Sequence, residues 1–269
     1  MRRILNRSCL WILCGLFLVV LLACDGVQFT AAPLPPSTQV VIVTQVVPVT
    51  RIIPVTPVAP QDTTLQFDGR DDCVELGNWF DFKEFSLSLW VKPAEQQEVW
   101  ANIIDDNHTD YRAWVVQQNE AQNNQYLFGA GSRASIIYFR LTSEVWHHIV
   151  MVRSRSESRV YVDNELVGSE IDLPLLRYDG TQSLRLGCWG GGGRNWAGAM
   201  AEVQIWQRAL TNAEVEELTS RPLSGKEEGL AAYYHFDEGQ GEVVRDASAW
   251  KRDGILRGEP RWVSARRTP

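Results

Sequence analysis

Short segments of alternating hydrophobic and polar residues follow one another from residue 63 onward. In residues 85–91 the apolar side chains fall on one side of an extended chain and two serines fall on the other, as a half-buried strand requires. Residues 146–152 form a longer apolar run that suits a strand covered on both faces. Further strands are expected near residues 64–68, 73–76, 111–117, 125–129, 135–139, 183–188, 199–206 and 230–236. Many short strands at close spacing predict an all-β fold of two antiparallel sheets, packed as a sandwich or jelly roll.

Two local signals refine this pattern. Asp163 and Asn164 divide an apolar segment into two strands, and both residue types tolerate the positive φ of a tight hairpin turn. Thr211 and Glu214 have the spacing of a capping box, in which each side chain accepts a hydrogen bond from the backbone N–H of the other residue. We therefore expect one short helix that begins after Thr211 and ends near Ser220.

The first 23 residues have the composition of a secretory signal peptide. Three arginines precede an apolar run of 15 residues, which is short for a membrane span and suits the h-region of a signal peptide. The run ends in Leu-Leu-Ala-Cys24, which resembles a bacterial lipobox whose cysteine is lipidated and becomes the mature N-terminus. Two acyl chains on Cys24 would anchor the protein stably. An uncleaved anchor helix is the alternative, and either interpretation predicts an exported protein held to the cell membrane on its extracytoplasmic side.

Residues 24–62 are rich in valine, threonine and proline. Proline breaks helices and pushes the residue before it toward extended geometry. We therefore expect an extended linker that lifts a domain comprising residues 63–269 off the membrane. The alternative is a β-prone segment that packs on this domain or aggregates.

The composition of the chain narrows the class of partner. Hydrophobic residues make up 45% of the 269 residues and include 11 tryptophans, which is enough for one core of ordinary size. The formal net charge of −7 becomes more negative once the three arginines of the signal peptide are removed. A chain of this charge lacks the basic footprint of nucleic-acid binding, so we expect no nucleic-acid partner.

Two cysteines, Cys73 and Cys188, follow Cys24 in the mature chain. Both fall in strand-like segments of a protein that we expect to be exported, where the compartment permits a disulfide. A disulfide between Cys73 and Cys188 and a pair of buried free thiols are both open on this reasoning. A CxxC metal site is excluded, because the two cysteines are alone and far apart in the sequence.

The ordered set of segments resembles a known family. Residues 65–76 (LQFDGRDDCVEL) resemble its opening strand pair, and residues 85–93 (FSLSLWVKP) resemble the strand that follows. The same order and spacing continue through WHHIV at 146–150, VYVDN at 160–164, LRLG at 184–187, WAGAMAEVQIW at 196–206 and RALTNAEV at 208–215. Over about residues 63–220 the chain is similar to the laminin G-like domain of the concanavalin A-like lectin/glucanase superfamily. The resemblance implies a two-sheet antiparallel jelly roll.

Residues 229–263 resemble a segment that often leads into a jelly roll in this family, although here it follows one. These residues are too few to form a second sandwich. We therefore expect them to add outer strands to the same domain, with Tyr234 and Phe236 facing inward.

Four consecutive glycines at residues 190–193 lie between Trp189 and Trp196. A phosphate-binding loop needs a helix N-terminus after it, and a strand is expected there instead. The run is then either a flexible hairpin-type loop or part of a ligand rim, where glycine lets a ligand approach the backbone. If the run is part of a ligand rim, the candidate ligand-binding residues are Trp189, Arg194, Asn195 and Trp196. The indole rings would stack on the faces of a sugar, and the polar side chains would form hydrogen bonds with its hydroxyls. The alternative for Trp196 is the buried aromatic position of the family.

The sequence matches known catalytic motifs only weakly. Glucanases of this superfamily carry an E-x-D-x-x-E strand, and the nearest sequence here offers Glu170 and Asp172 but has leucine at the third acidic position and an interrupting proline. His147 and His148 lie in a segment with the packing pattern of the family, so we expect structural roles for them. We therefore expect no enzyme, with a glycoside hydrolase as the less favoured alternative.

Acidic residues gather at the first expected turn. Asp68, Asp71 and Asp72 offer hard oxygen ligands of the kind that Ca²⁺ prefers. Family members often carry calcium near loops at the sheet edges, and one candidate ligand in the family is an aspartate. This chain has Ala201 at that position, which weakens the inference, and the neighbouring Glu202 remains as a fourth candidate ligand. The alternative is a solvated turn whose aspartates accept amide hydrogen bonds. The acidic loop at residues 105–110 has the same two interpretations.

These observations favour a non-catalytic jelly-roll binding module on a lipid anchor at the cell surface. We expect its loops to bind carbohydrate or a cell-surface protein, with Ca²⁺ as a candidate cofactor. The alternative from a different functional class is a structural or protein-interaction element of the cell envelope.

Overall fold

The computed structural model describes residues 63–106, 113–119, 122–132, 135–171, 173–178 and 181–264. The predicted signal peptide, the lipidation site Cys24 and the predicted linker lie outside these residues. Within the described ranges, no helix combines the length and the apolar character that crossing a membrane requires.

The described residues form two sheets and one helix. The strands of the first sheet are β1 (Thr63–Asp68), β3 (Phe85–Pro93), β8 (His147–Arg153), β9 (Glu157–Val162), β10 (Glu165–Ile171), β12 (Ala197–Trp206), β13 (Leu230–Tyr234) and β16 (Arg261–Ser264). The strands of the second sheet are β2 (Cys73–Gly77), β4 (Asn102–Asp105), β5 (Trp114–Asn119), β6 (Gln122–Ala130), β7 (Ile136–Arg140), β11 (Leu184–Leu186), β14 (Val243–Val244) and β15 (Gly254–Arg257). The helix α1 comprises Asn212–Glu217.

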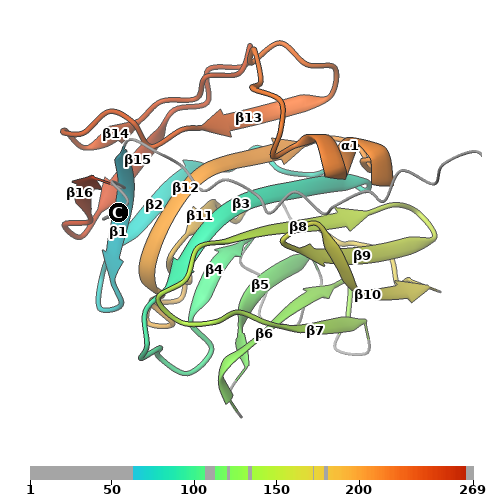
Figure 1. Cartoon of the computed structure of the whole chain (residues 1–269), viewed down its shortest axis with the longest axis horizontal. Helices are drawn as coiled ribbons and strands as arrows, with labels where there is room; N and C mark the ends of the chain where they lie inside the picture. The colour runs from blue at the N-terminus through green and yellow to red at the C-terminus, as the bar shows by residue number, and fades with distance from the viewer. Residues whose placement is uncertain are drawn as a thin grey trace, which may run out of the picture. The chain divides into compact units, whose positions relative to one another are not determined.

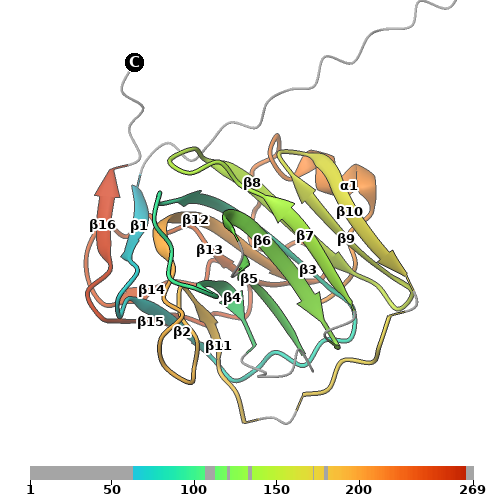
Figure 2. The same cartoon turned by 90° about the horizontal axis from the view of Figure 1, so that it is seen from below.

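The two sheets face one another as a sandwich (Figures 1 and 2). The first sheet has the strand order β10-β9-β8-β3-β12-β1-β16, and β13 joins it by pairing with β12. The second sheet has the order β14-β15-β2-β11-β4-β5-β6-β7. The strand pairs within both sheets are antiparallel, so the predicted all-β class with two antiparallel sheets is confirmed.

Aromatic side chains fill the space between the sheets. The rings of Phe80, Phe85 and Trp114 lie with their centroids 5.0 to 5.3 Å apart, and all three residues are buried. Phe85 belongs to β3 and Trp114 to β5, so this cluster joins the first sheet to the second. Burial of one such side chain stabilises the fold by roughly 1.5–3 kcal/mol. The cluster therefore holds the two sheets, which carry the loops at the strand ends, firmly together.

The C-terminal residues complete both sheets. β13 pairs with β12, β15 pairs with β2, and β16 pairs with β1. Tyr234 and Phe236 are fully buried in the core, as their alternation along the chain predicts. The register of the last pair places Ser264 opposite Thr63, so the described part of the chain starts and ends on neighbouring strands.

A second hydrophobic cluster covers the outer face of the first sheet. Val150 and Trp206 from the sheet pack there with Leu210 and Val215, which flank and lie in α1. The predicted capping box is present, because Thr211 Oγ1 accepts the N–H of Glu214 and Glu214 Oε2 accepts the N–H of Thr211. The helix is shorter than expected: it ends at Glu217, whose carbonyl then accepts hydrogen bonds from two further turn residues.

The expected hairpin joins β9 to β10. Asp163 and Asn164 form its two-residue turn with φ values of 52° and 69°, as the right-handed twist of the flanking strands requires. The turn is tied to β8, because Asp163 Oδ2 lies 2.7 Å from His147 Nδ1 and Asp163 Oδ1 accepts the N–H of His148.

Candidate binding site

Three loops meet at the edge of the sandwich where β1 ends and β12 begins. Asn195 joins them: its backbone N–H donates to Glu98 Oε2 at 2.6 Å, and its side-chain amide donates to the carbonyl of Arg70. The side chain of Gln97 bonds both the N–H and the carbonyl of Ala197. We call these loops the rim; it comprises residues 68–72, 94–98 and 188–196. The bonds between the loops fix the rim in one arrangement.

Asn195 therefore acts inside the rim. It is only 8% exposed, and its side-chain amide is used on the neighbouring loop. A ligand contact by Asn195 stays a prediction, and the structure shows a structural role for its side chain, whose Nδ2 donates to the carbonyl of Arg70.

The glycine run makes a tight turn that carries Trp189. The N–H of Gly192 donates to the carbonyl of Trp189, and Gly192 and Gly193 have φ values of 85° and 73°, which favour glycine. A Cβ at Gly191 would lie within 2.6 Å of three atoms of the Trp189 ring. The glycines thus let the backbone turn sharply and pack against the indole, and a strand follows them.

Trp189 and Arg194 form a pair on the rim surface. The guanidinium carbon of Arg194 lies 4.4 Å from the ring centroid of Trp189, a cation–π geometry. Both side chains are half-buried. Because Arg194 covers part of the indole, a ligand at this point meets a guanidinium together with the remaining part of the ring.

Trp196 lies in the core. It is 0% exposed, and its ring meets that of Phe67 edge-on with the centroids 5.9 Å apart. The structure corrects the prediction that Trp196 contacts a ligand and instead places it where the family resemblance puts a buried aromatic residue.

A disulfide joins Cys73 to Cys188. Cys73 begins β2, and Cys188 follows β11, the strand that pairs with β2. Both residues are buried, and their Cα atoms are 5.3 Å apart. The bond therefore ties the base of the glycine-rich loop to the second sheet.

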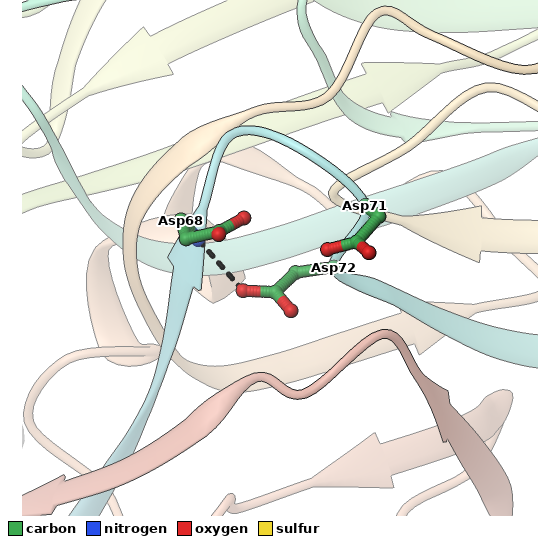
Figure 3. Close-up of side chains that lie close together, drawn as sticks. All are labelled: Asp68, Asp71 and Asp72. Carbon is green, nitrogen blue, oxygen red and sulfur yellow. Dashed lines mark hydrogen bonds between the residues drawn. The ribbon is translucent and has the colours of Figure 1, made fainter.

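The three aspartates of the first turn lie together (Figure 3). Each can direct a carboxylate oxygen so that all three atoms lie within 4.8 Å of one another. Asp68 and Asp71 are exposed and Asp72 is buried. Two oxygens on one Ca²⁺ at 2.3–2.6 Å lie at most about 5 Å apart, so the spacing of this donor set fits calcium.

Asp72 also holds the turn together. Its Oδ2 accepts the N–H of Asp68 at 2.7 Å, and its Oδ1 accepts the N–H of Glu259 at 2.9 Å. Burial raises the pKa of the Asp72 carboxyl above its ordinary value, although both backbone hydrogen bonds oppose the rise. The side chain thus clips the first turn to the loop before β16, and the exposed carboxylates of Asp68 and Asp71 remain for a ligand.

Glu202 lies away from this cluster. Asp68 pairs with Ala197, and Glu202 is five residues farther along β12, which corresponds to about 17 Å of strand. Its carboxylate accepts the hydroxyl proton of Tyr233 and lies 3.3 Å from His235 Nδ1. The structure therefore corrects the prediction that Glu202 shares a metal site with the three aspartates.

The remaining acidic and histidine candidates lie elsewhere. Glu170 belongs to the edge strand β10, and Asp172 falls outside the described residues. Asp105 and Asp106 are 2% and 3% exposed, and the rest of that acidic loop, residues 107–110, also falls outside the described residues. His147 uses both ring nitrogens inside the protein, because Nδ1 contacts Asp163 and Nε2 accepts the N–H of Thr142 at 2.9 Å.

Glu98 is a rim residue that sequence reasoning missed. It bonds the backbone of Asn195, almost one hundred positions away, and it lies in a loop without a recognisable motif. Only the pairing of the two loops in space reveals this role.

Solved structures share this fold. A candidate carbohydrate-binding protein from Bacteroides ovatus ATCC 8483 superposes with a TM-score of 0.62 at 15% identity, covering 77% of this chain and 60% of its own length. Domain 4 of AbnA, a GH43 extracellular arabinanase from Geobacillus stearothermophilus solved with arabinotriose, gives a TM-score of 0.47 at 18% identity and covers 58% of this chain and 76% of its own. The native heptameric SAP-like pentraxin from Limulus polyphemus gives 0.47 at 16% identity, with coverages of 60% and 83%. The present chain thus spans 60% of the length of the Bacteroides ovatus protein.

The family model described as concanavalin A-like lectin/glucanases matches residues 68–216, which is more than half of the chain. The matched residues run from the aspartate turn through the core strands to the capped helix. With the two-sheet architecture and the ordered motifs in agreement, this chain belongs to the concanavalin A-like lectin/glucanase superfamily.

Proposed function

We propose that the protein is a non-catalytic binding module that recognises carbohydrate at the rim. The observation that carries the proposal is the arrangement of the Trp189–Arg194 pair on a loop that Asn195 fastens to the aspartate turn. The Bacteroides ovatus protein, a candidate carbohydrate-binding protein, has the same fold, which supports this ligand class.

The chemistry of the rim suits a polar, uncharged ligand. The guanidinium of Arg194 donates hydrogen bonds, and the exposed carboxylates of Asp68 and Asp71 accept them. Sugar hydroxyls both donate and accept, so a saccharide satisfies both kinds of group, and the free part of the Trp189 ring adds an apolar contact. The acidic groups disfavour an anionic polymer at the same place.

Calcium is part of the proposal. Asp68 and Asp71 would supply the exposed oxygen ligands, with Asp72 behind them. A bound Ca²⁺ neutralises the like charges of the turn and offers further coordination positions to ligand hydroxyls.

We further propose that the mature chain begins at a lipidated Cys24 and is exported. The predicted linker would then hold the binding module at a distance from the membrane. The partner would therefore be carbohydrate or a cell-surface protein at the extracytoplasmic side of the cell membrane.

A second candidate function is protein–protein interaction in the cell envelope. The edge strand β10 exposes Leu166 and Ile171 to 54% and 67%, and Leu175 beyond it is 82% exposed. Exposed apolar residues on an edge strand are typical of a contact surface.

The experiment that tests the primary proposal is affinity electrophoresis of the full chain, solubilised in a mild detergent, in gels containing xylan, arabinan, glucomannan or laminarin. Each gel is run with Ca²⁺ and with EDTA. We expect retardation in at least one polysaccharide that weakens with EDTA and with Arg194→Ala. Arg221→Ala, an exposed arginine beyond α1, is the matched control. Unretarded migration in every gel would contradict carbohydrate binding and favour the protein-interaction candidate.

A further inference from the structure

A buried aspartate organises the loop between β14 and β15, outside the residues that match the family model. Asp246 is 1% exposed, and its Oδ1 accepts the N–H groups of Tyr233 and Ser248 at 2.9 and 2.8 Å. Its Oδ2 accepts the hydroxyl of Ser248 and the N–H of Arg252, both at 2.8 Å. Four bonds to one carboxylate fix residues 246–252 in a single conformation.

This loop places Arg252 between two indole rings. The guanidinium carbon lies 4.2 Å from the ring centroid of Trp79 and 4.5 Å from that of Trp250. Nη1 of Arg252 also donates to the carbonyl of Ala231 at 3.2 Å. Trp79 is held in turn, because its Nε1 donates to the carbonyl of Leu76 at 2.6 Å. The stack Trp79–Arg252–Trp250 is therefore anchored to both the core and the sheet.

Trp250 is the outer member of the stack and is 53% exposed. The other tryptophans within the described residues are buried or half-buried. Arg252 lies over the Trp250 ring, so the ligand-accessible part of the indole is the part that the guanidinium leaves uncovered. An exposed indole whose orientation is set by a cation–π contact presents a defined apolar surface to a ligand.

The same loop borders a hollow with a mixed lining. This cavity of about 430 Å³ is lined by Asp246, Ala247, Lys251 and Asp253 from the loop and by His235, Asp237, Glu238 and Arg245 from adjoining segments. The polar side chains among them supply both donors and acceptors of hydrogen bonds. The cavity volume is within the range of small-ligand sites.

We propose that Trp250 is the centre of a second carbohydrate subsite, which takes a neutral pyranose unit. The uncovered part of the indole stacks on the apolar face of the sugar ring, and the hollow, whose lining begins on this loop at the next residue, Lys251, offers charged side chains to its hydroxyls. Arg252 is a positioning residue that sets the orientation of the indole. The choice of carbohydrate as the ligand class rests on the proposed function. The location of the subsite does not, since Trp250 lies on a different loop from the rim.

A second subsite has a consequence for affinity. A polysaccharide that is already bound at the rim contacts Trp250 in an intramolecular step, so the second contact raises its overall affinity. A long chain is therefore bound more tightly than a short oligosaccharide, and loss of Trp250 removes this difference.

The test uses the full chain in detergent and the same four polysaccharide gels. We expect Trp250→Ala to weaken retardation roughly fivefold to tenfold, the loss of one aromatic contact, and Trp250→Phe to weaken it less. Tyr138→Ala is the matched control, because Tyr138 is 50% exposed on the edge strand β7. The thermal unfolding midpoint of each variant is measured alongside, so that a loss of binding is not confused with a loss of fold.

Each outcome separates this inference from the proposed function. Retardation that falls with Arg194→Ala and stays unchanged with Trp250→Ala overturns the second subsite and leaves the rim in place. Retardation that falls with Trp250→Ala and not with Tyr138→Ala supports the second subsite, whatever Arg194→Ala does. A wild-type chain that migrates freely in all four gels overturns both.

Discussion

The imidazole Nε2 of His148 lies 2.8 Å from Ser88 Oγ, and both residues are buried. Burial lowers the pKa of His148 to about 4, and the nearby Asp163 carboxylate only partly opposes this shift. The imidazole is therefore neutral in the folded protein near neutral pH. Through its contact with Ser88 it joins the neighbouring strands β3 and β8.

This lowered pKa predicts a pH dependence of stability. The unfolded chain takes up a proton on His148 near pH 6.5, whereas the folded chain does so only near pH 4, so stability is intact above pH 6.5 and declines as the pH falls toward 4. The loss attributable to His148 is about 3 kcal/mol at the lower limit. Urea unfolding at pH 7 and pH 4.5 measures it.

His148→Gln is the variant that isolates this contribution. The pKa of His235 is raised by its hydrogen bond to Glu202, so His235 stabilises the fold as the pH falls and acts in the opposite sense. We expect His148→Gln to lose stability less steeply than the wild-type chain between the two pH values. Equal slopes for the two proteins would contradict a buried neutral imidazole.

The disulfide predicts sensitivity to reductant. It closes a loop with a sequence separation of 115, so its removal is expected to cost about 2–5 kcal/mol, mainly through the entropy of the unfolded chain. The measurement is urea unfolding with and without dithiothreitol. The double variant Cys73→Ser/Cys188→Ser serves as the control: it should unfold at the same urea concentration in both buffers.

The helix cap predicts a smaller effect. Thr211→Ala removes the acceptor for the N–H of Glu214 and should cost about 1 kcal/mol, because α1 carries Val215 onto the outer face of the first sheet. Thr142→Ala, at an exposed threonine outside any helix, is the comparison. A thermal midpoint for Thr211→Ala equal to that of Thr142→Ala would show that the cap is dispensable.

The two tryptophans of the glycine-rich loop should behave differently. Trp196→Ala empties a fully buried site and should cost about 3–5 kcal/mol of stability. Trp189→Ala removes a half-buried ring on the rim and should leave the thermal midpoint nearly unchanged while weakening polysaccharide retardation. A stable Trp196→Ala variant would contradict the placement of this ring in the core.

Calcium binding can be tested without any sugar. If the aspartate turn binds Ca²⁺, an excess of about one hundred times the dissociation constant stabilises the fold by about 2.7 kcal/mol, which appears as a rise in the thermal midpoint. Asp68→Asn/Asp71→Asn should abolish the rise and keep the Asp72 bonds that hold the turn. Asp237→Asn is the control, because Asp237 is an exposed carboxylate away from the aspartate turn, in the hollow that Lys251 and Asp253 also line. An identical rise in the double variant would place the ion elsewhere.

The fold was largely predictable because its signals are local. The alternation in β3, the Asp163–Asn164 turn and the Thr211 cap each depend on neighbours along the chain. β4 was missed, because its four residues, NIID, are all buried and show no alternation. β16 belongs to the outer strands expected within residues 229–263, but its position could not be predicted, because none of its residues is fully buried and only its pairing with β1 makes it a strand.

The candidate site was predictable only in part. The clustering of the three aspartates follows from a short turn, so the sequence spacing was sufficient. Glu202 was misplaced because the distance between two residues along paired strands depends on the register, which no local pattern reveals. The direction of Trp196 and the partner of Glu98 likewise depend on contacts between loops far apart in the sequence.

The pairing of Thr63 with Ser264 has a mechanical consequence. A force applied between these two positions pulls apart one end of a strand pair and breaks its hydrogen bonds one after another. A force between Thr63 and a ligand bound, as we propose, at Asp68–Asp72 would run along β1 instead, and it would load the bonds to β12 and β16 together. The strand pairing is therefore expected to resist tension applied along β1 far better than tension between Thr63 and Ser264.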